Sequence, residues 1–471
     1  MNTISRIGLL SLSISLASCT SLSPDGGFSS VQSVAEKRLD KKLVWAKTPE
    51  QQKLVQDEVR RLLAKPLSVD DAVQLALLNN RGLQAQYAEL GLSEADLISA
   101  GRLPNPHFSM LRAHKTENGM RDYKIEQAFV MNVFAFITMP QAIAIERKRF
   151  EQTQALVAMQ MLSLAADTRK AYVQAIASQQ TLAYMQQVQE AAQASAELAK
   201  RMFEVGNFNQ LQLAREQNFY ADAAVNVARA DLIARNCREG LTRALGLWGA
   251  QTQFRLPERL PDLPQTARDI PDVEQMAIAQ RLDLQALRIE TDSLAKNLGL
   301  TKTTRFINVL EFGPARVLEG HKGDPYKKGY EISFELPIFD WGTSKVARAQ
   351  TLYEQQLNRA AQMAIEARSE VRQAYGTYRI QFDIAKHFRD EIVPLRMRIS
   401  DENLLRYNGM FIGVFELLAD KRSQITAVNG YIDALRDFWL AQADLEMSLL
   451  GKPMLSTTSG PRASATQEAG H

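Results

Sequence analysis

The longest regular pattern of apolar and polar positions lies in a stretch without glycine or proline, from Gln141 to Val205. Apolar side chains recur there at every seventh position, at Ile143, Phe150, Val157, Leu164 and Ala171. This spacing keeps an apolar seam facing a partner helix in a coiled coil. Gly206 follows, and a second such run from Asn207 to Glu239 predicts an antiparallel return helix. The pattern therefore predicts a long helical hairpin.

A helix and a β-hairpin are predicted before this stretch. Ser68 is expected to cap a helix that runs to about Gly101, and Pro104-Asn105-Pro106 stops it. The apolar period then changes to two, which predicts a strand with one apolar and one polar face. The apolar face holds Tyr123, Ile125, Phe129, Met131 and Val133, and the polar face holds Lys124, Glu126 and Asn132. With the weaker strand from Phe108 to Lys115, this gives a hairpin within residues 106–134.

The same order of parts returns about 200 residues later, which indicates a tandem duplication. Leu83-Gln84-Ala85 corresponds to Leu284-Gln285-Ala286. A second hairpin is predicted at residues 305–337, from strand candidates at Arg305–Phe312 and around Tyr330 to Leu336. A long helix is expected from Trp341 or Gly342, a second tip at Tyr407–Gly413 and a return helix at Val414–Leu450.

The resulting division of the chain is a signal peptide at 1–18, an arm at 19–66, a first repeat at 67–250, a proline-rich linker at 251–271, a second repeat at 272–451 and a tail at 452–471. The arm is polar and is expected to be lightly structured. The tail is rich in Ser, Thr, Ala and Gly, and is expected to be disordered.

The N-terminus has the features of a secretory signal. Arg6 precedes an apolar run from Ile7 to Leu16, which is too short to cross a bilayer. The tetrapeptide Leu16-Ala17-Ser18-Cys19 resembles a bacterial lipobox, which implies that Cys19 carries diacylglycerol and a fatty acyl chain. Thr20 follows it, and by the same resemblance the destination is the outer membrane. The alternative is an ordinary signal peptide that happens to contain a cysteine.

Composition and scattered side chains exclude several functions. A net charge of +3 over 471 residues argues against a nucleic-acid binder. The only other cysteine is Cys237, so acylation of Cys19 would leave no pair for an intrachain disulfide. No catalytic constellation is present, which predicts a protein that is not an enzyme. The five histidines show no ligand spacing, and neither a metal site nor a cofactor besides the lipid is expected.

The four one-sided strands predict an assembly of several chains in a membrane. Strands of about ten residues cross a bilayer when tilted, but their open edges are not tolerated in lipid. Four strands per chain must therefore be pooled between chains. Three chains give a twelve-stranded barrel with a lumen, which suits Glu126, Glu331 and Glu335 better than the packed interior of an eight-stranded barrel.

Several motifs together resemble the TolC family of outer-membrane efflux proteins over roughly residues 66–450. They are the lipobox, the two repeats, Asn80-Arg81-Gly82-Leu83, Arg281-Leu282-Asp283-Leu284, the corner Leu336-Pro337-Ile338-Phe339-Asp340-Trp341-Gly342 and the Tyr407 tip. The resemblance implies a mainly α fold with a small transmembrane β part. In that fold a homotrimer forms an α-barrel in the periplasm and a β-barrel in the outer membrane. It also implies two partners, a periplasmic adaptor protein and an inner-membrane pump.

The resemblance also implies site residues. The adaptor-docking tips match Val205, Gly206 and Asn207 in the first repeat, and Gly409, Met410 and Phe411 in the second. The second tip departs from the family pattern, because Met410 stands where a glycine is usual. The first repeat also lacks a close copy of the Pro337 corner. An acidic ring at the periplasmic entrance matches Glu416, with weaker help from Asp420, and the alternative for Glu416 is a solvated charge.

The function implied is a passive exit duct of a tripartite efflux system for drugs, toxic compounds or metal ions. An outer-membrane conduit for type I protein secretion is the alternative within the channel class. A non-conducting lipoprotein coiled-coil scaffold is the alternative from another class, although a scaffold needs no lipid-facing hairpins. Neighbouring genes distinguish efflux from secretion, and the sequence names no substrate.

Overall fold

The computed structural model describes residues 23–117, 120–306 and 309–452, which divide into two compact units. Among these residues, the first unit takes 23–31, 86–157 and 283–364, and the second takes 32–85, 158–282 and 365–452. Each unit therefore contains segments of both predicted repeats. The predicted signal peptide, Cys19 and all but the first residue of the predicted tail lie outside the described residues.

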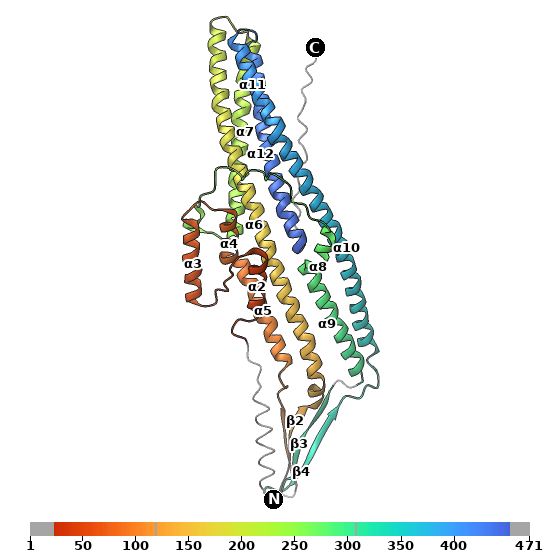
Figure 1. Ribbon diagram of the computed structural model, residues 1–471. Coiled ribbons are helices and arrows are strands. Elements are labelled where there is room, and N and C mark those ends of the chain that lie inside the picture. The colour runs from red at the N-terminus through yellow and green to blue at the C-terminus, as the bar shows by residue number, and fades with distance from the viewer. Residues whose placement is uncertain (1–22, 118–119, 307–308, 453–471) are drawn as a thin grey trace. The chain divides into compact units, whose positions relative to one another are not determined.

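The described chain is mostly helical, and Figure 1 shows its elements. The helices are α2 (Phe28–Leu39), α3 (Pro49–Leu63), α4 (Val69–Asn79), α5 (Arg81–Ala100), α6 (Val133–Glu204), α7 (Gln210–Leu245), α8 (Val273–Gln280), α9 (Leu282–Thr304), α10 (Thr343–His387), α11 (Val393–Asn408) and α12 (Val414–Leu450). The strands are β1 (His107–Glu117), β2 (Met120–Asn132), β3 (Leu310–Gly320) and β4 (Lys327–Phe334). The two predicted long helical hairpins are confirmed as α6–α7 and α10–α11–α12.

The first unit contains one antiparallel sheet in the order β1-β2-β3-β4. Its register places Phe108 opposite Phe129, and Phe312 opposite Ile332. Because paired residues share a face, these side chains lie on one apolar face, where they are 47 to 59% exposed. The other face is polar, and Lys124 contacts Glu126 at 2.8 Å. The predicted one-sided strands are thus confirmed, except that Val133 begins α6 and is not part of β2.

The second hairpin starts later than the sequence predicts. Residues 305 and 306 form a turn after α9, and the strand begins only at Leu310. The prediction of a strand at Arg305–Phe312 is therefore wrong at its start, and β3 extends to Gly320, where a loop was expected. Gly313 allows this pairing because a Cβ atom there would lie 1.9 Å from the carbonyl oxygen of Phe129.

Helix α6 begins at Val133, before the predicted start at Gln141. The side chain of Asn132 accepts a hydrogen bond from the amide of Ala135 at 3.1 Å and so caps the helix. Pro140 lies inside α6, although proline normally interrupts a helix interior. The predicted helix start at Gln141 is therefore eight residues too late, because Asn132 caps the helix ahead of Pro140.

The N-terminal arm is helical, so the prediction of a lightly structured arm is wrong for α2 and α3. Helix α3 starts with a capping box between Thr48 and Gln51. Its residues Val55, Val59 and Leu62 are buried in the core of the second unit. The apolar spacing of these three residues could have indicated the helix within an otherwise polar composition.

The predicted helix from Ser68 to Gly101 is broken at Asn80, which has the extended backbone angles φ −67° and ψ 116°. Its side-chain oxygen accepts a hydrogen bond from the amide of Leu83 at 3.1 Å and starts α5. Its side-chain amide donates to the carbonyl oxygen of Ala244. Arg281 makes the matching break between α8 and α9, at φ −66° and ψ 125°. The two repeats therefore share a break as well as their longer elements.

The core of the second unit gathers α3, α4, α6, α7, α10, α12 and the predicted linker. The short 3-10 helix Gly249–Thr252 leads into the linker, and no further helix follows until α8. It is nevertheless packed, because Phe254, Leu260 and Leu263 are buried in the same cluster. Phe438 of α12 is fully buried among the aromatic rings of this core.

Candidate functional site

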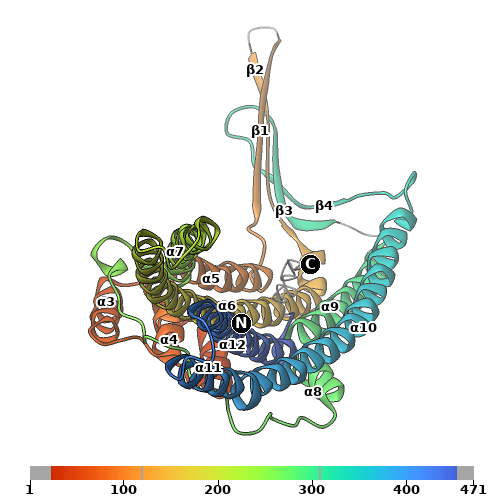
Figure 2. The ribbon, with the colours of Figure 1, turned by 90° about the horizontal axis from the view of Figure 1, so that it is seen from above.

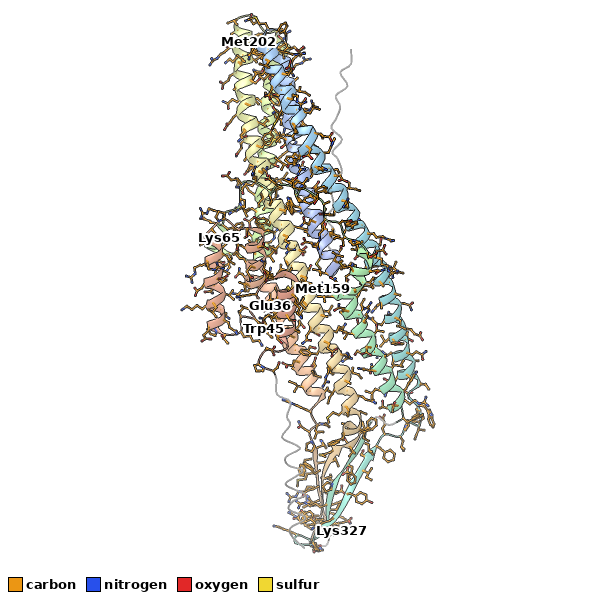
Figure 3. All side chains as sticks on the ribbon, in the orientation of Figure 1. Glu36, Trp45, Lys65, Met159, Met202 and Lys327 are labelled. Carbon is orange, nitrogen blue, oxygen red and sulfur yellow. The ribbon has the colours of Figure 1, made fainter. Side chains whose placement is uncertain are left out.

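Two helical tips lie at the same end of the second unit, one between α6 and α7 and one between α11 and α12 (Figure 1). At the first tip, Val205 is 70% exposed and Gly206 has φ +79°. The amide of Gly206 donates to Phe203, and that of Asn207 donates to Met202. Figure 3 marks Met202 at this end of α6. Asn209 then caps α7.

The second tip has the same backbone hydrogen bonds as the first. The amide of Met410 donates to Tyr407 at 2.9 Å, and that of Phe411 donates to Arg406 at 2.9 Å. Met410 has φ +63°, a left-handed conformation that favours glycine. Met410 thus occupies the place of Gly206 in the first tip. Met410 and Phe411 are 93% and 83% exposed, so both tips present side chains outward from this chain.

The two predicted entrance acids differ in their surroundings. Glu416 is exposed in the first turn of α12. Asp420 lies one turn further along the helix and is only 8% exposed. Within the described part of the chain, the Oδ2 atom of Asp420 has no hydrogen-bond partner. Of the two predicted acids, only Glu416 is therefore exposed at this tip, and the acidic ring stays a prediction.

A buried charged cluster that the sequence reasoning missed connects the two hairpins. Glu216 of α7 is buried, and it accepts hydrogen bonds from the Ser195 hydroxyl of α6 at 2.7 Å and from Arg422 of α12 at 2.9 Å. The Arg422 guanidinium lies 4.2 Å from the centre of the Phe219 ring. The sequence holds one signal for this cluster. Glu216 is a carboxylate in a seven-residue series whose next members are Ala223 and Ala230.

A cleft of about 220 Å³ lies beside this cluster. Its walls come from α6, α7 and α12, and include Tyr184, Val188, Phe219, Leu418 and Arg422. Near it, Lys421 donates to the Ser400 hydroxyl of α11 at 2.5 Å. Polar contacts therefore join α12 to α7 and to α11 close to the tips.

Arg281, the first residue of the Arg281-Leu282-Asp283-Leu284 segment, makes buried polar contacts in the second unit. The Arg281 side chain is fully buried and donates to Glu370 of α10 at 2.8 Å. It also lies 3.5 Å from the carbonyl oxygen of Ser448 in α12. Arg281 therefore joins the start of α9 to α10 and α12.

No metal-binding group stands out in the described residues, where no cluster of three or more His, Cys, Asp or Glu side chains is found. At the sheet, the Nδ1 atom of His321 lies 3.4 Å from the Oδ1 atom of Asp122, and both side chains are exposed. Lys327 marks the same region in Figure 3. Cys237 is partly buried against the core of the second unit.

None of the helices in the described residues has an apolar stretch long enough to cross a membrane.

Comparisons with known proteins agree with this architecture. Residues 72–247 match the family model described as outer membrane efflux protein. The cobalt-zinc-cadmium resistance protein CzcC of Cupriavidus metallidurans is 24% identical over 288 residues, which cover 59% of this chain and 65% of that protein, less than two thirds of its length.

Solved structures share the fold. A structure of CusC superimposes with a TM-score of 0.68 at 16% identity, covering 82% of this chain and 92% of that chain. The CmeC outer-membrane channel of Campylobacter jejuni gives 0.67 at 16% identity, covering 85% and 88%. This chain thus shares the fold of these structures, with paired helical hairpins and a small antiparallel sheet.

Proposed function

We propose that this chain is the outer-membrane exit duct of a tripartite efflux system and works as a homotrimer. The observation that carries the proposal is the four-stranded sheet. Its strands pair in one row, so β1 and β4 are edge strands among the described residues. One face exposes Phe108, Phe129 and Phe312, which suit lipid better than water.

Closure of such a sheet requires other strands at both edges, because lipid leaves unpaired backbone groups unsatisfied. Three copies supply twelve strands, an even number that forms a barrel with a lumen. The polar face, with Glu126 and Lys124, then lines the lumen. The family match and the shared fold support this arrangement.

The partners proposed are a periplasmic adaptor protein and an inner-membrane pump. The adaptor is proposed to dock on the exposed tips around Val205 to Asn207 and Gly409 to Phe411. Glu416 is proposed to form the acidic ring at the periplasmic entrance. Passive conduction needs no catalytic group, and the match of residues 72–247 to the outer membrane efflux protein model supports this role.

The lipid anchor is proposed at Cys19, with the duct held in the outer membrane and extending into the periplasm. In the Cys19→Ala variant, labelling with radioactive fatty acid is expected to disappear while assembled trimers stay in the membrane fraction. Persistent labelling of this variant would show that the lipid is attached elsewhere.

Metal cations are the proposed cargo, because a relative that matches this chain is named a cobalt-zinc-cadmium resistance protein. The decisive experiment compares the growth of a deletion strain with that of its parent and of the complemented deletion strain, in cobalt, zinc, cadmium and a panel of drugs. Loss of resistance to the three metals alone is expected. Sensitivity to drugs alone would contradict the metal cargo but keep the duct, whereas loss of a secreted protein would favour the type I conduit.

Mass measurement and planar-bilayer recording of the detergent-solubilised protein test the assembly itself. Three chains per particle and a steady conductance are expected. A stable monomer would contradict the pooled barrel, and a trimer without conductance would favour the non-conducting scaffold.

A further inference from the structure

The four strands divide their charges unequally between the two faces of the sheet. Every acidic side chain that the structure describes in these strands lies on the polar face, as the register and the alternation of side chains require. On that face Lys124 contacts Glu126 at 2.8 Å. Lys327 contacts Glu319 there at 3.6 Å. The apolar face holds no acid among its described side chains, yet it carries the cations Arg112, Arg121, Arg316 and Lys328.

Two of these cations lie directly opposite each other. Arg316 of β3 and Lys328 of β4 are cross-strand partners on the apolar face, and both are exposed. Their Cβ atoms are therefore expected about 5 Å apart, and like charges in this position destabilise a sheet. An anion bound between the two side chains would remove the repulsion. The pair thus has the arrangement of an anion-binding site.

Neighbouring side chains hold the Arg316 side chain in place. Its Nε atom donates a hydrogen bond to the side-chain oxygen of Gln127 in β2 at 2.6 Å. Its guanidinium lies 4.9 Å from the centre of the Tyr326 ring. A guanidinium that is already ordered loses less conformational entropy when it binds, and guanidinium groups often bind phosphate through two hydrogen bonds. These contacts therefore favour a phosphate as the anion.

The opposed cations lie at one end of the apolar face. Figure 3 marks Lys327, the first residue of β4, at the end of the sheet away from the helices of the first unit, and in Figure 2 the strands project clear of those helices. Exposed apolar side chains continue in the other direction from Tyr330 to Leu336. From Lys328 to Leu336 the chain would rise roughly 19 Å across a bilayer, at about 3.3 Å per residue and a tilt of about 45°. A lipid-facing cation costs much at the middle of a bilayer and little near its border, so Arg316 and Lys328 are expected at the border.

We propose that Arg316 and Lys328 bind a phosphate group of lipid A, the anionic lipid of the outer leaflet, on the lipid-facing surface of the duct. This inference rests on the proposed function, which places the helices in the periplasm and the far end of the sheet at the outer leaflet. Lipid A carries its phosphates on an apolar anchor, whose acyl chains cover Tyr330 and Ile332, both exposed, while a phosphate reaches the two cations. A free phosphate ion has no apolar part to match this face.

Titration of the full-length trimer in detergent with fluorescently labelled lipid A tests the site. The probe carries both of its phosphates, and its affinity is measured at low and at high salt. Lys328→Gln and Arg316→Gln are each expected to weaken binding roughly fivefold, because a cation near an anionic lipid surface contributes about that factor. High salt is expected to weaken binding to the parent, because it screens exposed charges.

Lys327→Gln is the matched control for Lys328→Gln. Lys327 is adjacent in the sequence, but it lies on the polar face beside Glu319, so the affinity of this variant is expected to equal that of the parent. Equal weakening by the two variants would show that lipid A responds only to net charge, and it would overturn the site. Equally tight binding of dephosphorylated lipid A would overturn it as well, and displacement of the probe by inorganic phosphate at equal concentration would replace it with a free-anion site.

Thermal unfolding of the trimer gives an independent measurement. Without lipid A, Lys328→Gln removes one of two opposed cations, so its Tm is expected to be at least that of the parent. With lipid A, the Tm of the parent is expected to rise more than that of the variant. A lower Tm of the variant in both conditions, with unchanged affinity for lipid A, would overturn the proposal. A conducting trimer that binds no lipid A would also overturn it but keep the proposed function, whereas a stable monomer would contradict the proposed function itself.

Discussion

The buried pair Arg281–Glu370 predicts an unequal response to removal of its two members. The Arg281 side chain is fully buried, whereas Glu370 keeps 18% of its side-chain exposure. In Glu370→Ala the guanidinium stays buried without this carboxylate, which costs about 3–5 kcal/mol. In Arg281→Met an apolar side chain of similar length fills the site and water can reach Glu370, so the expected loss is only about 1–2 kcal/mol.

Thermal unfolding of the solubilised trimer, followed by circular dichroism, measures both variants. For Glu370→Ala a fall in Tm of roughly 3–5 °C is expected. The double variant Arg281→Met with Glu370→Ala is expected to be more stable than Glu370→Ala alone, because it also removes the buried positive charge that has lost this carboxylate. If Arg281→Met unfolds at a lower temperature than Glu370→Ala, the reasoning about the buried charge is wrong.

Three other predictions concern the tips and the N-terminal helix. Glu416→Ala is expected to weaken cation selectivity and divalent block in bilayer recordings, whereas Glu204→Ala on the first tip changes neither; equal effects would place the constriction elsewhere. Met410→Gly removes a non-glycine residue from a left-handed conformation, so the free energy of unfolding is expected to rise by up to about 1 kcal/mol, and the Tm with it. A lower Tm would show that the Met410 side chain makes a stabilising contact. Hydrogen bonds from the side chain and backbone of Ser29 lower the pKa of Asp25 to about 2. This folded-state pKa is below the ordinary 3.8, so the stabilisation of α2 is complete above pH 3.8 and is lost as the pH falls toward 2. Asp25→Ala should therefore speed amide exchange in α2 near neutral pH but not at the acid end, and an unchanged exchange rate would show that the hydrogen bonds from Ser29 to Asp25 do not stabilise α2.

The long elements could be predicted from the sequence because their signals repeat many times. Seven-residue spacing identified α6, and strict alternation identified β2 and β4. Gly206 and Met410 lie at corresponding places in the two repeats, and both predicted tips are found there. In each case the local pattern and the final packing favour the same structure.

Local exceptions could not be predicted so well. Asn132 caps α6 ahead of Pro140, and Gly313 lets β3 approach β2, but each depends on a single side chain or its absence. The cluster of Glu216 with Ser195 and Arg422 joins residues far apart in the chain. Only the folded backbone brings such groups together, so no local spacing reveals their contacts.

The interleaving of the two repeats has a consequence for the origin of the chain. Each repeat supplies one β-hairpin, and an isolated two-stranded hairpin is at best marginally stable in water. Neither unit consists of a single repeat. A half-length ancestor could therefore not have completed this fold alone, and it would have folded by association with a second copy of itself. On the proposed trimer, six half-length chains would supply the same number of β-hairpins as three full-length chains.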